Sequence, residues 1–316
     1  MHASLRALMD GLVGYAGLFP PAELGLEAAV REYGAHLQSD DQWMLGDFIV
    51  PASRLTELTA WREVMAGGDR SWRFVVLPRG GDLDALESSL REDFAAMDDF
   101  EQAMEGRAAV SGIEIRLPSS IAIESAATAR WMDRLHSVVR ERVLDVFVEP
   151  VRGTGWPEML ANTADVLSQV RTAIAGPNFG MKLRCGGVTA DAFPSVDEVA
   201  EFIEVSRKFE VPFKATAGLH HPIRHHHAPL GVDMHGFVNV FAAALFASDG
   251  LLGDDLRALL AEPHASCFQW TDDRLSWKGH VIGTERIREL RAGQVANYGS
   301  CSFSEPCEDL RALGWL

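Results

Sequence analysis

Residues 180–221 read GMKLRCGGVTADAFPSVDEVAEFIEVSRKFEVPFKATAGLHH, and this stretch decides the fold. Two short runs rich in apolar residues, 180–185 and 211–217, predict strands on either side of a segment of helical length. Ser195 and Glu198 stand at the spacing of a capping box, which predicts where the helix begins. A strand, a helix and a second strand form a βαβ unit, whose two strands run parallel.

The same alternation of strand-type runs and helix-length segments extends along the chain of 316 residues. Eight such units predict an α/β fold, the (β/α)8 TIM barrel, with an open doubly wound sheet as the second choice. No GxGxxG follows the first strand, which weakens a dinucleotide-binding interpretation. The eight predicted strands are residues 12–19, 46–52, 72–77, 111–117, 144–149, 180–185, 211–217 and 267–271.

The chain contains no repeat longer than the βα unit, no low-complexity linker and no break in composition. We therefore expect a single barrel domain over residues 1–316. We expect the tail after Ala292 to pack back on this barrel.

The composition excludes several classes of partner. The chain has 29 Lys+Arg against 45 Asp+Glu, a net charge of −16, so we expect neither nucleic acid nor a membrane as partner. Four cysteines without CxxC spacing predict no disulfide framework and no zinc ribbon. A poor signal peptide and the lack of a membrane-length apolar run predict a cytoplasmic protein. The sequence leaves the oligomeric state open, a homo-oligomer included.

Period-two alternation separates the two faces of each predicted strand. In the fourth to seventh strands the apolar face must meet the helices, so the charged face must point into the barrel. A purely structural salt-bridge network is the alternative, but buried charges are costly, and barrel enzymes keep their chemistry at the C-terminal ends of the strands. We therefore expect the active site there. The inward charged residues are Glu114, Arg116, Glu149, Lys182, Arg184 and Lys214.

The formal charges of this inward set sum to +2, which predicts a small anionic substrate, a carboxylate or a phosphate. Arg116 and Arg184 are the expected anion clamp, and Thr216 is a further expected substrate contact. Gly186 and Gly187 follow the sixth strand and could let backbone N–H groups approach the anion.

Lys182 and Lys214 occupy matching positions on adjacent predicted strands, about 4.8 Å apart. Two ammonium groups so close disfavour each other's charge, so the pKa of one lysine should fall. A lysine with a lowered pKa is the nucleophile needed for Schiff-base chemistry on a carbonyl, and Glu149 or Glu114 would then move protons. The alternative is that each lysine is ion-paired to one of these glutamates, with no free amine.

Residues 181–218 resemble the consecutive-strand lysine pair of barrel-type class I aldolases of the deoxyribose-phosphate aldolase kind. The resemblance implies that Lys182 forms the Schiff base and that Lys214 perturbs it. The Thr-Ser-Thr-Gly run of that family is replaced here by LRCG at 183–186. With KATAGLHHP at 214–222, MHGF at 234–237 and GSCSFSEP at 299–306, the whole chain is similar to an uncharacterised bacterial family of barrel proteins.

Six of the eleven histidines lie between His220 and His235, in the loop expected after the seventh strand. Imidazoles near carboxylates can bind Zn, Mn or Fe, and His220, His221 and His235 are the candidate ligands. The spacing matches no HExxH signature, so a solvated loop is the alternative. Without a metal, His220 or His221 is a candidate general base.

Three functions follow from these features. The first is a lyase or isomerase that acts on a small anionic carbonyl compound, with a Schiff base of the aldolase kind. The second is a metal-dependent barrel hydrolase or lyase that uses the loop of residues 220–235. The third is a barrel without catalytic activity that serves as a binding or scaffold subunit.

Overall fold

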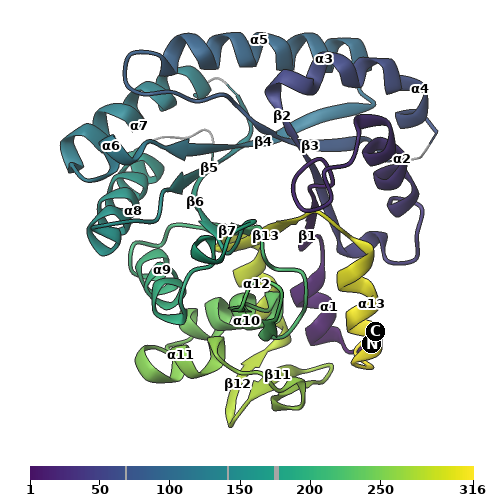
Figure 1. Cartoon of the computed structure of the whole chain (residues 1–316), viewed down its shortest axis with the longest axis vertical. Coiled ribbons are helices and arrows are strands. Elements are labelled where there is room, and N and C mark those ends of the chain that lie inside the picture. Colours follow the sequence, from purple (N-terminus) through teal and green to yellow (C-terminus); the bar gives the residue numbers. More distant parts are fainter. Residues whose placement is uncertain (68–69, 141, 174–177) are drawn as a thin grey trace. The chain divides into compact units, whose positions relative to one another are not determined.

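The computed structural model describes residues 1–67, 70–140, 142–173 and 178–316 (Figure 1). Eight parallel strands close into a barrel in the order β1, β13, β7, β6, β5, β4, β3 and β2. The predicted α/β class and (β/α)8 barrel are therefore confirmed. The barrel strands are β1 (Val13–Tyr15), β2 (Leu45–Pro51), β3 (Trp72–Leu77), β4 (Ala108–Leu117), β5 (Asp145–Pro150), β6 (Asn178–Arg184), β7 (Phe213–Thr216) and β13 (Val295–Ser300).

The chain forms two compact units. The first contains Met1–Glu23, Asp40–Gly46 and Leu183–Leu316, and the second contains Leu24–Ser39 and Asp47–Lys182. A single domain over residues 1–316 stays a prediction. Among the described residues, no helix combines the length and the apolar composition that crossing a membrane requires.

In the second unit, helices cover the apolar faces of the strands. Ile113, Ile115 and Leu117 alternate along β4 and are all buried, as the period-two pattern predicts. The ring of Phe74 in β3 meets Phe100 of α5 (Leu86–Met104) edge-on at 5.3 Å, so this face of the strand packs against the helix layer. The helices of this unit are α2 (Leu26–His36), α3 (Leu55–Leu58), α4 (Arg62–Met65), α5 (Leu86–Met104), α6 (Ser119–Ala122), α7 (Ser125–Val139) and α8 (Trp156–Ala173).

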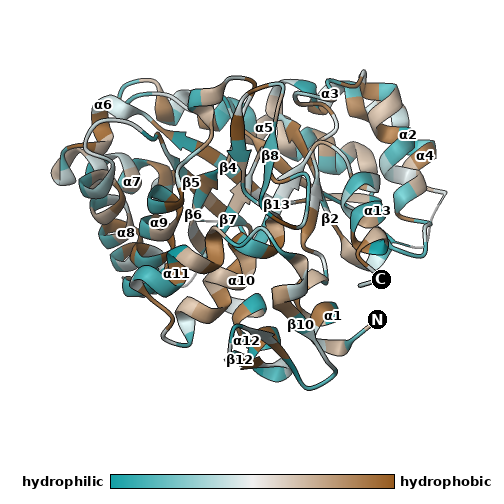
Figure 2. Ribbon diagram, turned by 60° about the horizontal axis from the view of Figure 1, so that its bottom comes forward, coloured by the Kyte–Doolittle hydropathy of each residue, from teal (hydrophilic) through white to brown (hydrophobic). Residues whose placement is uncertain are grey.

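In the first unit, β13 pairs with both β1 and β7. The predicted capping box is present at the start of α9 (Val196–Lys208), where the Glu198 backbone N–H donates to Ser195 Oγ and the Ser195 N–H donates to the Glu198 carboxylate. Helix α10 (Phe237–Ser248) is buried along nearly its whole length and is mostly brown in Figure 2. The other helices are α1 (Ala3–Met9), α9 (Val196–Lys208), α11 (Gly253–Leu260), α12 (Thr284–Gly293) and α13 (Ser304–Ala312).

Two small antiparallel sheets lie outside the barrel, and one of them contains the predicted eighth strand. Residues 267–271 include β10 (Phe268–Trp270), which pairs with β11 (Arg274–Trp277), and β11 pairs in turn with β12 (His280–Gly283). The prediction of this barrel strand was therefore wrong. The Thr271 N–H donates to the Arg274 carbonyl across a tight turn, so the chain reverses at once and has no room for the crossover that a parallel neighbour needs. The second small sheet pairs β8 (His225–His227) with β9 (Val232–Met234).

The eighth barrel strand is β13, in the tail after Ala292. Tyr298 of β13 pairs with Val13 on one side and with Ala215 on the other. This tail therefore supplies the last barrel strand and α13, rather than packing against a barrel completed earlier in the chain.

Candidate active site

Two glutamates and one lysine form a buried charge cluster in the second unit, called here the Glu–Lys cluster: Glu114, Glu149 and Lys182. Lys182 Nζ lies 2.8 Å from Oε2 of Glu114 and 2.7 Å from Oε2 of Glu149, and no side chain of the three is more than 5% exposed. The register sets this arrangement, because Val148 pairs with Met181 and the next residues of the two strands are Glu149 and Lys182. Since β4 and β6 flank β5, Lys182 meets Glu114 on the inner side of the strands, as the alternation predicts.

The Glu–Lys cluster holds Lys182 as an ammonium. Burial alone would lower the pKa of Lys182, but the carboxylates of Glu114 and Glu149 favour the charged form and raise the pKa above its ordinary value. The lowered pKa expected of a Schiff-base lysine is therefore not found at Lys182. The ion-paired alternative describes this residue in the resting protein.

The two arginines of the predicted anion clamp are exposed. Arg116 Nη2 donates to Oε1 of Glu149 at 3.2 Å, and the Arg116 side chain is 61% exposed. Arg184 is exposed at the last residue of β6. Both lie where parallel strands end, so they can meet solvent. The other four residues of the predicted inward set are buried: Glu114, Glu149, Lys182 and Lys214. Their formal charges cancel, so the buried residues do not carry the expected net charge of +2.

The second predicted catalytic lysine, Lys214, and the remaining predicted substrate contacts belong to the first unit. Lys214 in β7 is 2% exposed, and Thr216 is half-buried at the end of the same strand. A Cβ on Gly186 would lie 2.7 Å from Cα of Gly218, and a Cβ on Gly187 would lie 2.7 Å from a neighbouring side chain. Gly186 is therefore explained by the close approach of the loops after β6 and β7, and Gly187 by its contact with Ala192 in its own loop, whether or not their N–H groups bind an anion.

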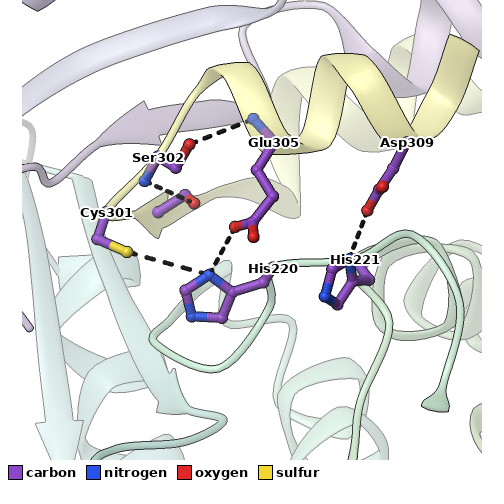
Figure 3. A network of polar contacts seen from close by, with 7 residues as sticks. His220, His221, Cys301, Ser302, Glu305 and Asp309 are labelled. Carbon is purple, nitrogen blue, oxygen red and sulfur yellow. Dashed lines mark hydrogen bonds and ion pairs between the residues drawn. The ribbon is translucent and has the colours of Figure 1, made fainter. Parts of the chain in front are cut away.

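The loop after β7 contacts α13 through two consecutive histidines (Figure 3). His220 Nδ1 lies 3.1 Å from Oε2 of Glu305 and 4.0 Å from Sγ of Cys301. His221 Nδ1 is hydrogen-bonded to the carboxylate of Asp309. Glu305 and Asp309 are four residues apart, so they share one face of α13 and hold the two rings side by side.

The contacts of His220 keep its ring charged. Hydrogen bonds with Cys301 and then Glu305 raise the pKa of His220 to about 9, although burial opposes this change. The hydrogen bond with His220 also lowers the pKa of Glu305. At neutral pH His220 is therefore an imidazolium, which donates a proton, and the general base expected from the sequence is not its resting state.

His235, the third candidate metal ligand, is fully buried and both of its ring nitrogens have partners. Nε2 donates to the carbonyl of Pro194 at 2.9 Å, and Nδ1 accepts from Arg224 at 3.2 Å. Burial lowers the pKa of His235 to about 4, so the ring is neutral. In the part of the chain that the structure describes, no three His, Cys, Asp or Glu residues are grouped to hold a metal ion. The set of His220, His221 and His235 therefore does not fit a Zn, Mn or Fe site.

Cys301, Glu305 and Asp309 are site residues that the sequence patterns did not predict. All three follow β13, and placing the eighth strand at residues 267–271 left this segment outside the barrel. One signal was available, because Ser302 and Glu305 have the spacing of a helix start, and Ser302 Oγ accepts from the Glu305 N–H at 3.2 Å. A loop between a strand and such a helix is where barrel enzymes carry functional residues.

Comparison with known proteins gives a match in structure alone. No protein-family model and no curated protein sequence matches the chain. Among solved structures, the chain is similar to one described as a putative deoxyribose-phosphate aldolase from Toxoplasma gondii, with a TM-score of 0.50 and 11% identity over 98% of this chain and 93% of that chain. At this identity the likeness shows the barrel fold and no more.

Proposed function

We propose that the protein is an aldolase-like lyase that forms a Schiff base between Lys182 and a small anionic carbonyl compound. The observation that carries the proposal is the position of Lys182 Nζ, 2.7 Å and 2.8 Å from two buried carboxylates on the inner side of the strands. Buried ion pairs rarely gain stability over apolar packing, so the Glu–Lys cluster is better explained by chemistry than by folding. The similar solved structure is described as a putative deoxyribose-phosphate aldolase, which agrees with this class of reaction.

Schiff-base formation requires a neutral amine. Lys182 therefore transfers a proton to Glu114 or Glu149 before its nitrogen attacks the carbonyl carbon. The carbonyl oxygen then leaves as water, with protons that the same carboxylates supply. The protonated imine carries a positive charge, and two carboxylates placed to stabilise an ammonium stabilise this charge as well.

Arg116 is the residue proposed to bind the anionic group of the substrate. Its guanidinium is exposed, and its hydrogen bond to Glu149 ties it to the Glu–Lys cluster. A guanidinium binds a carboxylate or a phosphate through two parallel hydrogen bonds. Arg184 and Thr216 are proposed as further substrate contacts, and Lys214 as the perturbing lysine that the aldolase resemblance implies.

Reductive trapping tests the proposal, because the chain has four lysines and each adduct can be assigned by mass: Lys182, Lys208, Lys214 and Lys278. With cyanoborohydride and a panel of small aldehydes, keto acids and their phosphate esters, we expect an adduct on Lys182 at least about tenfold faster than on exposed Lys208. Lys182→Arg keeps the positive charge but forms no imine under these conditions, so it should lose the adduct. An adduct confined to Lys214, or none on any lysine across the panel, would overturn the assignment.

The pH dependence of trapping follows from the raised pKa of Lys182. Below that pKa the amine fraction grows about tenfold per pH unit, so the rate of adduct formation should rise in this way from about pH 6 to 8. Glu114→Gln removes one of the charges that raise the pKa, so the profile should move to lower pH and the rate at pH 7 should increase. The measurement is the initial rate of adduct mass at fixed aldehyde concentration. A rate independent of pH would contradict an ammonium ground state.

A further inference from the structure

We infer that Cys301 is a reactive thiol that exchanges with low-molecular-weight disulfides, and that His220 is its proton partner. This site belongs to the first unit and uses none of the residues of the Glu–Lys cluster. The test of this inference is therefore independent of the test of the Schiff-base proposal.

The geometry places a thiol beside an imidazole at the end of a barrel strand. Cys301 follows the last residue of β13, and its Sγ lies 4.0 Å from Nδ1 of His220 (Figure 3). The turn that carries Cys301 is held by two hydrogen bonds, from the Ser302 N–H to Ser300 Oγ at 3.4 Å and from the Glu305 N–H to Ser302 Oγ at 3.2 Å. Cys301 is half-buried, so the residue is partly open to small reagents. A thiol beside a cationic imidazole is the environment in which cysteines become reactive.

The other three cysteines lie in environments that suppress reactivity. Cys185 and Cys307 are buried, and burial raises the pKa of Cys307 to about 12. Cys267 is half-buried like Cys301, but burial and the Glu262 carboxylate raise its pKa. Cys267 is therefore a matched control within the same molecule, a half-buried thiol beside an acid instead of an imidazole.

The exchange requires no metal, and the disulfide is its oxidant. The Cys301 thiol gives its proton to a base in the solvent, and the thiolate beside the His220 imidazolium attacks one sulfur of R–S–S–R. The S–S bond between Cys301 and R forms as the S–S bond of R–S–S–R breaks, and the leaving thiolate takes the proton from the His220 imidazolium as R–SH. The neutral His220 ring then regains a proton from the solvent. Cys301 is oxidised to the mixed disulfide, and one equivalent of the small thiol is the reduced product.

The first experiment uses the unmodified full chain. The protein is mixed with 4,4′-dithiodipyridine at pH 7 in the presence of a chelator, and the modified cysteine is identified by peptide mass. We expect one equivalent to react on Cys301 at least about tenfold faster than on Cys267. Equal rates at the two residues would overturn the inference.

The second experiment tests the proton partner with His220→Asn, in which the Asn amide can still donate a hydrogen bond to Glu305 but carries no transferable proton. Two neutral disulfides are compared, the aromatic 4,4′-dithiodipyridine and the aliphatic 2-hydroxyethyl disulfide, whose leaving thiolate is the more basic. We expect a loss of about tenfold with the first and about a hundredfold with the second, because the poorer leaving group depends on the imidazolium proton. No loss, or an equal loss with both disulfides, would overturn the role of His220. Modification of Cys185, which is buried in the folded protein, would show that the variant is unfolded. The reactivity of Cys301 is then judged from the comparison of Cys301 with Cys267 in the unmodified chain.

Discussion

Lys182→Met is expected to lower the free energy of unfolding by about 3–5 kcal/mol at pH 7. Methionine fills a similar volume, but it removes the ammonium that Glu114 and Glu149 share at 2.8 Å and 2.7 Å. The buried carboxylates of Glu114 and Glu149 then lie close together with no ammonium between them, and they repel each other. Urea denaturation measures the loss, and Lys208→Met, at an exposed lysine, is the control, with an expected change below about 1 kcal/mol.

The pH dependence of this loss has a definite sign. In the Lys182→Met protein, burial and mutual repulsion raise the folded-state pKa values of Glu114 and Glu149 above their unfolded values. A carboxyl whose pKa is raised in the folded state contributes its full stabilisation at a pH below its pKa in the unfolded chain. This stabilisation is lost as the pH rises through the pKa of the folded state. The deficit should therefore be largest near neutral pH and shrink toward about pH 4. Adding Glu114→Gln should recover part of it, because Glu149 keeps its hydrogen bond with Arg116. A loss equal to that of the exposed control would contradict the role of the Glu–Lys cluster.

Asn239→Asp is expected to destabilise the protein by a similar amount, about 3–5 kcal/mol at pH 7. Asn239 in α10 is fully buried. Its Oδ1 accepts from the Arg224 N–H at 2.8 Å, and its Nδ2 donates to the carbonyls of Leu259 and Glu262 at 3.0 Å and 2.9 Å. Aspartate keeps the first bond but places a charged oxygen against two carbonyl oxygens, so both acceptors lose their donor.

The matched control for Asn239→Asp is Asn162→Asp. The Asn162 amide makes one exposed hydrogen bond to a backbone carbonyl, so its replacement should change stability by less than about 1 kcal/mol. Denaturation at pH 7 and pH 5 adds a second check, because the introduced carboxyl regains one donor when it is protonated, and the deficit should be smaller at pH 5. Equal effects of the two substitutions would mean that the buried contacts of Asn239 do not hold the loop after β7.

The alternation of residue types is what made most of the barrel predictable. In β4 the apolar residues at 113, 115 and 117 leave Glu114 on the opposite face, and this parity alone identifies the inward side. The start of α9 was also predictable, because the Ser195–Glu198 capping box is a local interaction that needs no tertiary contact.

The last barrel strand and the residues after it were not predictable in this way. Between Val295 and Ser300, β13 contains small and polar residues such as Asn297 and Gly299, so it shows no apolar stripe. Its place depends on pairing with β1 and β7, which are far away in the sequence. Because the strand was missed, the contact of Cys301 with His220 was missed as well.

The prediction of a lowered lysine pKa failed at Lys182 for a different reason. Parity shows which charged residues share a face, but it gives no distances. The argument from two neighbouring lysines considered the repulsion between ammonium groups, whereas the structure places two carboxylates within 2.8 Å of Lys182 Nζ. Opposite charges in direct contact determine the sign of a pKa shift at a buried site.

The pairing of β1 with β13 has a consequence for the protein during its synthesis. Residues 13–15 are translated about 285 positions before their partners on this side, residues 298–300. At ~5–20 residues per second, the nascent chain keeps this edge of β1 unpaired for roughly 15–60 s. An unpaired strand edge invites association with other chains, so the growing polypeptide should depend on chaperones until its last strand is complete.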